Sequence, residues 1–160
     1  YSSAASDVYK RQFLTCMAAL DHDKAHDVGE YLEESSSIQA ACPWYPPTNL
    51  STFKYKDAEE CAASMESLLL GYNIMRNIKE AYNSSPVSKV TKDAPPFLII
   101  HGINDQTVPF EQSEELYDKL IENGCDADLI ALEGADHADM QFFQDELWDR
   151  IIDFFKTKLG

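Results

Sequence analysis

Two residues near the end of the chain could carry out acid–base chemistry together. Asp105 lies in the sequence HGINDQTVP, and His137 lies 32 residues later in EGADHADM. A carboxylate that accepts a hydrogen bond from one imidazole nitrogen fixes the tautomer of the ring and stabilises the imidazolium that forms during catalysis. The other nitrogen is then free to deprotonate a serine, so the pair indicates hydrolytic chemistry of the Ser-His-Asp type.

Each of these residues follows a short apolar run. FLII, at residues 97–100, precedes Asp105, and LIAL, at residues 129–132, precedes His137. Apolar residues at helical spacing over residues 111–123 separate the two runs. Strand, helix, strand in this order predicts a parallel α/β sheet, in which one crossover unit returns the chain to the same sheet edge. Since reacting groups gather at the carboxyl ends of parallel strands, we expect the two side chains to touch.

The rest of the chain supplies further elements of the same α/β pattern. Proline cannot donate to a sheet ladder, so Pro46 and Pro47 end one apolar run in a loop at the strand's carboxyl end. We expect, in chain order, the tail of a buried helix at 13–20, a strand at 38–43 with its loop at 45–50, two helices within 57–82, and a terminal helix with Phe143, Leu147, Ile151, Phe154 and Phe155 on its core face.

The nucleophile of a triad is missing. In this fold the serine usually sits in a GxSxG turn between a strand and a helix, and no GxSxG occurs in the 160 residues. Residues 2–12 read SSAASDVYKRQ, which matches the in-frame translation of a common sequencing-library adapter. We therefore expect a non-native tail at 1–12 and, at 13–160, the C-terminal portion of one hydrolase domain, inactive alone.

Charge and composition exclude several classes of partner. The chain has 28 acidic and 13 basic residues, a formal net charge of −15, and no basic stripe. Nucleic-acid binding depends on attraction to phosphates, and docking on an anionic membrane depends on basic residues, so neither partner is expected. No apolar stretch approaches the ~20 residues that span a bilayer. The compartment stays open, with the cytoplasm slightly favoured, and so does the oligomeric state.

Metal and disulfide chemistry are not expected, and no cofactor motif appears. The four cysteines are widely spaced without any CxxC, which favours reduced thiols over a zinc site or a disulfide scaffold. Two groups with ligand-type side chains are better interpreted as an ordinary loop and a solvated linker: Asp136, His137 and Asp139, and His22 with His26.

These motifs resemble a known family. APPFLIIHGINDQTVPFEQSEELYDKL is similar to PPxLIxHGxxDxxVPxxQSxxLxxxL, the stretch that carries the triad acid in α/β-hydrolase-fold serine esterases, and GADH resembles their histidine loop. IQAACPWYPPTNL resembles their QAVxxxYGPTDL, and FLTCMAAL resembles the helix after the nucleophile. The small carboxylesterases that include acetyl-xylan and feruloyl esterase-like enzymes are the most similar group.

The resemblance implies roles for particular residues. Asp105 would be the triad acid, His137 the general base, and the substrate a small-molecule ester, with no cofactor. His101 would shape the turn with Gly102 and would be structural. Residues 57–82, together with Trp44, Tyr45 and Pro46, could form a cap over the substrate. This sequence departs from the family pattern at three positions: Pro47 where glycine–proline is common, Asn49 for the usual Asp, and Ala138 where glycine often follows the histidine.

Two other functions stay open. A peptidase of the prolyl oligopeptidase type shares this catalytic half and would require a β-propeller encoded upstream. A non-enzymatic binding module of flavodoxin or response-regulator type would leave Asp105 incidental. That module would need a phosphate loop or an acidic pocket at the first strand, and neither is visible in the sequence.

Overall fold

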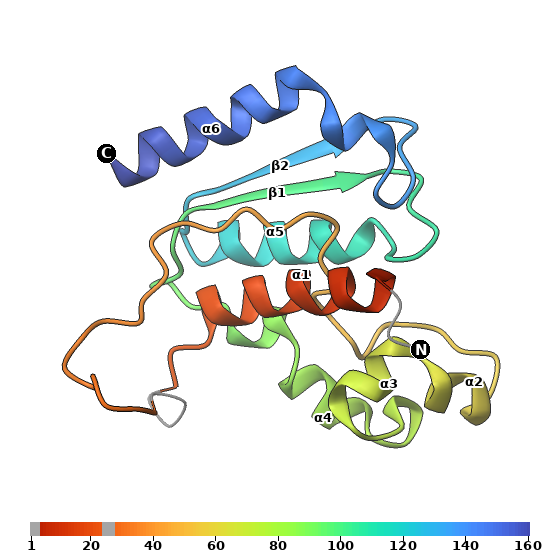
Figure 1. Ribbon diagram of the computed structural model, residues 1–160. Coiled ribbons are helices and arrows are strands. Elements are labelled where there is room, and N and C mark those ends of the chain that lie inside the picture. Colours follow the sequence, from red (N-terminus) through yellow and green to blue (C-terminus); the bar gives the residue numbers. More distant parts are fainter. Residues whose placement is uncertain (1–3, 24–27) are drawn as a thin grey trace.

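The computed structural model describes residues 4–23 and 28–160. Two parallel strands, β1 (Phe97–Gly102) and β2 (Ala127–Leu132), are joined by helix α5 (Glu111–Glu122). They pair in register from Phe97 opposite Ala127 to Gly102 opposite Leu132. Both strands therefore end at the same edge (Figure 1), as the sequence predicts.

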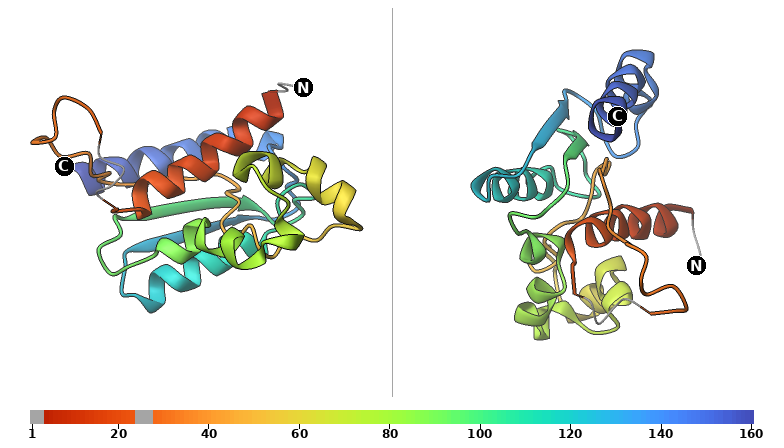
Figure 2. Two further views of the ribbon diagram at one scale, coloured as in Figure 1. Left: turned by 90° about the horizontal axis from the view of Figure 1, so that it is seen from below. Right: turned by 90° about the vertical axis from the view of Figure 1, so that its left-hand side faces the viewer.

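Helices cover both faces of this strand pair. Helix α1 (Ala4–Leu20) and α5 lie on one side, and α6 (Asp145–Leu159) lies on the other, as Figures 1 and 2 show. Alternate residues of a strand point to opposite faces: Ile99 belongs to the core cluster that includes residues of α1 and α5, and Ile100 belongs to the cluster that includes residues of α6. Burial on both faces explains why β1 reads as a continuous apolar run.

A third extended segment runs beside β1 but is not a regular strand. Parallel bridges join Ala41 to Phe97 and Trp44 to Ile100. The strand predicted at 38–43 is therefore wrong in its extent: pairing begins at Ala41, and Ile38 is 40 % exposed. Pro43 lies between the two bridges, and because it has no N–H group it interrupts the ladder.

The helical stretch at 57–82 contains three short α-helices where the sequence predicts two. They are α2 (Ala58–Ala63), α3 (Met65–Leu70) and α4 (Ile78–Asn83). Ser64 separates the first two, because its extended backbone ends α2 while its side chain accepts a hydrogen bond from the amide of Ser67 and caps α3. Buried residues of this region cluster with Phe13 of α1.

Helix α1 and the segment before α6 differ from their expected limits. Helix α1 begins at Ala4 and thus continues across the expected boundary at residue 12. Phe143 ends a 3₁₀ turn before α6 and is 56 % exposed, so it does not belong to the buried face of that helix as predicted. All four cysteines carry free thiols. Within the described residues, no helix has the length and apolar character needed to cross a bilayer. Within the part of the chain that the structure describes, 3₁₀ turns lie at Ile74–Arg76, Pro86–Lys89 and Met140–Phe143.

Candidate active site

Asp105 is held in a turn directly after β1. Its Oδ1 atom accepts hydrogen bonds from the backbone amides of Thr107 and Val108, each at 2.8 Å. Its Oδ2 atom lies 2.7 Å from Nδ1 of His137, which comes from the loop after β2. The predicted contact between the two side chains is present. An ionised carboxylate can only accept, so Nδ1 carries the proton and Nε2 is the nitrogen left to accept one.

The two loops are also tied to each other through Asp136. Its Oδ1 atom accepts hydrogen bonds from the backbone amides of Gln106, at 3.0 Å, and His137, at 2.7 Å. These two amides lower the pKa of Asp136, because they favour the ionised carboxylate. The backbone of Asn104 adds a bond to the carbonyl of Ala135. Asp105 and His137 thus lie on loops that are joined independently of the contact between the two side chains.

A glycine permits the close approach of these loops. A Cβ atom placed on Gly102 would lie 2.4 Å from the backbone oxygen of Ala135. After the histidine, Ala138 has φ 55°, in the left-handed region that favours glycine. The glycine that often follows the histidine in the family would therefore adopt this backbone conformation with less strain than Ala138 does.

Tyr45 packs against the imidazole of His137. The two ring centroids are 4.3 Å apart, and the tyrosine ring also contacts Phe142 edge-on at 5.0 Å. Burial raises the pKa of Tyr45, and the charge of Asp105 raises it further. Its φ of 39° is uncommon for a residue other than glycine. The sequence places Tyr45 in the loop after the predicted strand and, by the family resemblance, in the possible cap over the substrate, and neither expectation specifies its contact with His137.

The loop that carries Tyr45 is fixed by α5. The Oε1 atom of Gln112 accepts hydrogen bonds from the amides of Thr48, at 2.9 Å, and Asn49, at 2.7 Å. The side-chain amide of Asn49 donates to both carboxylate oxygens of Glu115. An aspartate at position 49 would instead face Glu115 with a second negative charge, so the departure at Asn49 fits its surroundings.

The electrostatic environment keeps Asp105 ionised. Burial by itself raises the pKa of Asp105, but hydrogen bonds from His101, His137 and the Val108 amide lower it, and the net result is a pKa well below the usual range. His101 is fully buried, with Nε2 3.3 Å from the Oδ2 atom of Asp105. The sequence indicates only a structural role for His101 and gives no sign of its contact with Asp105.

This low pKa predicts a pH-dependent contribution to stability. A carboxyl whose pKa is depressed in the folded state stabilises that state above its unfolded pKa of about 3.9, and the contribution is lost as the pH falls toward the folded pKa. We expect Asp105→Asn to lower the free energy of unfolding by about 2 kcal/mol at pH 6 and by progressively less below pH 4. Urea unfolding of both proteins between pH 6 and pH 3 measures the difference, and a constant difference would contradict the assignment.

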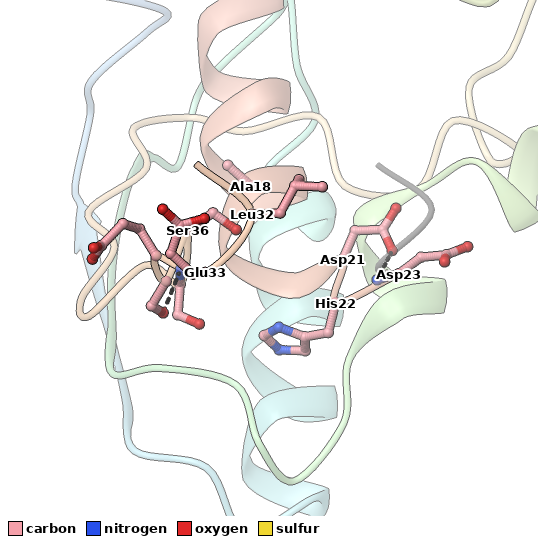
Figure 3. Close-up of a pocket in the computed structure, with 10 residues that line it drawn as sticks. Ala18, Asp21, His22, Asp23, Leu32, Glu33 and Ser36 are labelled. Carbon is pink, nitrogen blue, oxygen red and sulfur yellow. Dashed lines mark hydrogen bonds between the residues drawn. The ribbon is translucent and has the colours of Figure 1, made fainter. Parts of the chain in front are cut away.

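A separate pocket lies at the C-terminal end of α1, away from the carboxyl ends of the strands. Figure 3 shows its lining, which includes His22 and the carboxylates of Asp21, Asp23 and Glu33. Its volume is about 350 Å³. The described residues contain no group of three or more ligand-type side chains that could hold a metal ion, and His26 lies outside them. We assign this pocket no chemistry.

Comparison with known proteins decides the family. The sequence profile of the family described as BD-FAE matches residues 12–120. The chain belongs to the BD-FAE family. Curated relatives of this BD-FAE chain include the probable carboxylic ester hydrolase LipM of Mycobacterium tuberculosis (strain ATCC 25618 / H37Rv), 27 % identical over 107 residues that cover 67 % of the chain and 25 % of LipM. Esterase LipQ of the same organism is 30 % identical over 70 % of the chain and 26 % of LipQ.

Solved structures agree with this family. A structure described as a truncated form of carbohydrate esterase from gut microbiota matches 92 % of this BD-FAE chain and 56 % of its own, with a TM-score of 0.79 and 25 % identity. Esterase 2 of Thermogutta terrifontis matches with a TM-score of 0.63 over 93 % of the chain and 52 % of its own, at 23 % identity, which shows the fold. The chain therefore has the α/β-hydrolase fold of an esterase family. It spans about a quarter of the two curated relatives and about half of the two solved chains.

Proposed function

We propose that this chain is the C-terminal part of a serine carboxylic ester hydrolase, in which Asp105 is the triad acid and His137 the general base. The observation that carries the proposal is the 2.7 Å hydrogen bond between His137 Nδ1 and Asp105 Oδ2 at the carboxyl ends of two parallel strands. Membership of the BD-FAE family and the esterase names of the relatives support ester hydrolysis as the reaction.

The geometry suits the acyl-transfer steps of such an enzyme. A serine hydroxyl supplied by an upstream segment would give its proton to Nε2 of His137 as its oxygen attacks the carbonyl carbon of a small-molecule ester. His137 then returns the proton to the departing alcohol, and Asp105 stabilises the transient imidazolium. A water molecule, deprotonated in the same way, releases the acid and regenerates the serine.

An upstream segment could pack into an apolar groove of the described chain. An apolar groove of about 750 Å³ lies between α1 and α6, along the side of the 41–44 segment that does not pair with β1. The amide of Trp44 on that side donates to Oε1 of Gln12 at 2.8 Å. Gln12 belongs to the tail that we propose is adapter-derived, so this side chain occupies a position that a further strand could fill. The groove is lined by Arg11, Leu14, Thr15, Ala18, Ile38, Ala40, Ala41, Cys42, Trp44, Trp148, Ile151 and Phe155.

The genomic DNA upstream of Phe13 tests this directly. We expect an open reading frame that continues upstream and encodes GxSxG shortly before FLTCMAAL, because the helix after the nucleophile begins at that turn. In place of residues 1–12 we expect an unrelated sequence. A genomic frame that encodes SSAASDVYKRQ itself, with no such serine upstream, would contradict the proposal.

The chain on its own should not turn over esters. Both the nucleophile and the oxyanion hole, which needs the amide after the nucleophile and another from an early loop, would be supplied by the upstream segment. We expect the rate of p-nitrophenyl acetate hydrolysis to equal that of the His137→Ala variant within error. A rate of the unmodified chain about tenfold or more above this control would show that a nucleophile is already present.

A further inference from the structure

A buried series of polar contacts leads from Ser113 of α5 through His101 to Asp105. His101, the fifth residue of β1, is fully buried, and so is Ser113 of α5. The Oγ atom of Ser113 lies 2.6 Å from Nδ1 of His101. On the other side of the ring, Nε2 lies 2.9 Å from the carbonyl oxygen of Val108 and 3.3 Å from Oδ2 of Asp105. Asp105 thus has two imidazoles on one oxygen, that of His101 and that of His137.

The partners of His101 determine its tautomer. A carbonyl oxygen can only accept a hydrogen bond, so Nε2 of His101 carries a proton that faces both Val108 and Asp105. Within the described residues the hydroxyl of Ser113 has no other hydrogen-bond partner, and it is satisfied if it donates to an unprotonated Nδ1. A neutral ring with hydrogen on Nε2 satisfies all three partners without burying a positive charge.

We propose that His101 is a positioning residue for the catalytic pair: held in one tautomer by the Val108 carbonyl, with Ser113 donating to its Nδ1, it donates to the same Asp105 oxygen that accepts from His137 and so fixes that oxygen toward the base. Two backbone amides already hold the other oxygen of Asp105. With His101 the carboxylate is held at both atoms and cannot rotate away from His137. The functional consequence rests on the proposed triad, whereas the series of polar contacts does not.

The unmodified chain offers a first test by nitrogen-15 NMR. At pH 7 we expect His101 to show a protonated Nε2 and an unprotonated Nδ1. A ring protonated on Nδ1 would overturn the proposal, because that nitrogen would then donate to Ser113. Replacing Ser113 by alanine removes the hydroxyl but leaves the Val108 carbonyl, so we expect the same tautomer with a shifted Nδ1 resonance. An unchanged Nδ1 resonance in Ser113→Ala would overturn the donation from Ser113.

A matched pair of variants tests the donation to Asp105. His101→Gln keeps an N–H donor near the position of Nε2, whereas His101→Leu fills the space without a donor. In His101→Leu we expect the Nδ1 proton resonance of His137 to move downfield, because Asp105 Oδ2 then serves one donor fewer. The resonance in His101→Gln should stay near that of the unmodified chain. If both variants move it equally, or neither does, the donor role is wrong.

The carboxyl carbon of Asp105 gives a second site-specific readout. Loss of the His101 donor disfavours the ionised carboxylate, so the NMR titration of this carbon should begin about one pH unit higher in His101→Leu than in His101→Gln. The other titratable groups near Asp105, namely His137, Tyr45 and Asp136, are the same in both variants. An identical onset would overturn the proposal. Because these measurements need no turnover, they can succeed or fail independently of the proposed esterase activity.

Discussion

Replacing His137 by alanine in the completed enzyme is expected to lower kcat/KM for p-nitrophenyl acetate by about four orders of magnitude. The completed enzyme is the full-length hydrolase that we propose: this chain from Phe13 onward, joined to the upstream part that the genomic DNA is expected to encode. Without the imidazole, no group takes the proton of the attacking serine, and Asp105 loses the 2.7 Å hydrogen bond that it accepts from His137. Binding and the oxyanion hole should leave a small residual rate.

The control for this variant is another histidine. His22→Ala removes an exposed imidazole at the far end of α1 and is expected to leave kcat/KM unchanged. Asp105→Asn should lower kcat/KM about as much as His137→Ala, and the double variant should lose little more, because residues that act as a unit are not additive. Retention of more than about a tenth of the activity by His137→Ala would exclude it as the general base.

Replacing Gly102 by alanine is expected to destabilise the fold by about 3 kcal/mol. The new Cβ atom would lie 2.4 Å from the backbone oxygen of Ala135, and a backbone atom cannot move aside as the end of a flexible side chain can. The strand ends would have to separate, and with them the loops that carry Asp105 and His137. Urea unfolding measures the loss of stability, and the His137 Nδ1 proton resonance reports the loss of the contact.

Gly124→Ala is the matched control for that variant. Gly124 has φ +74° and no atom within 4 Å of an added Cβ, so alanine there adds backbone strain without a clash. We expect this change to cost about 1 kcal/mol. A Gly102→Ala variant that loses no more stability than Gly124→Ala would mean that the loops do not depend on their close approach.

The parts of the structure that could be predicted from sequence are those with local signals. Apolar runs and helical spacing located β1, α5 and β2, and the parallel order of these elements placed Asp105 and His137 at one edge. The strand predicted at 38–43 is reduced to two isolated bridges, because Pro43 has no N–H group to donate to the ladder. The apolar residues around it do not make up for that loss. Ser64 likewise divided a stretch whose composition is helical throughout.

The surroundings of the pair were beyond sequence reasoning for a different reason. The contacts of His101 with Ser113 and of Tyr45 with His137 join residues that only the folded arrangement brings together. Neither contact leaves a periodic pattern in the chain, because a single side chain makes each of them. A histidine next to a glycine at a strand end reads as a turn feature until its partners are known.

The hydrogen bonds that Asp136 accepts affect which residues of the two loops can vary within the family. Asp136 joins the two loops through the backbone amides of Gln106 and His137, and every residue except proline supplies an amide. The residue at position 106 can therefore change to any residue except proline without loss of the backbone hydrogen bond to Asp136. In the proposed hydrolase, the loops that carry Asp105 and His137 can therefore stay joined while the side chain at position 106 varies.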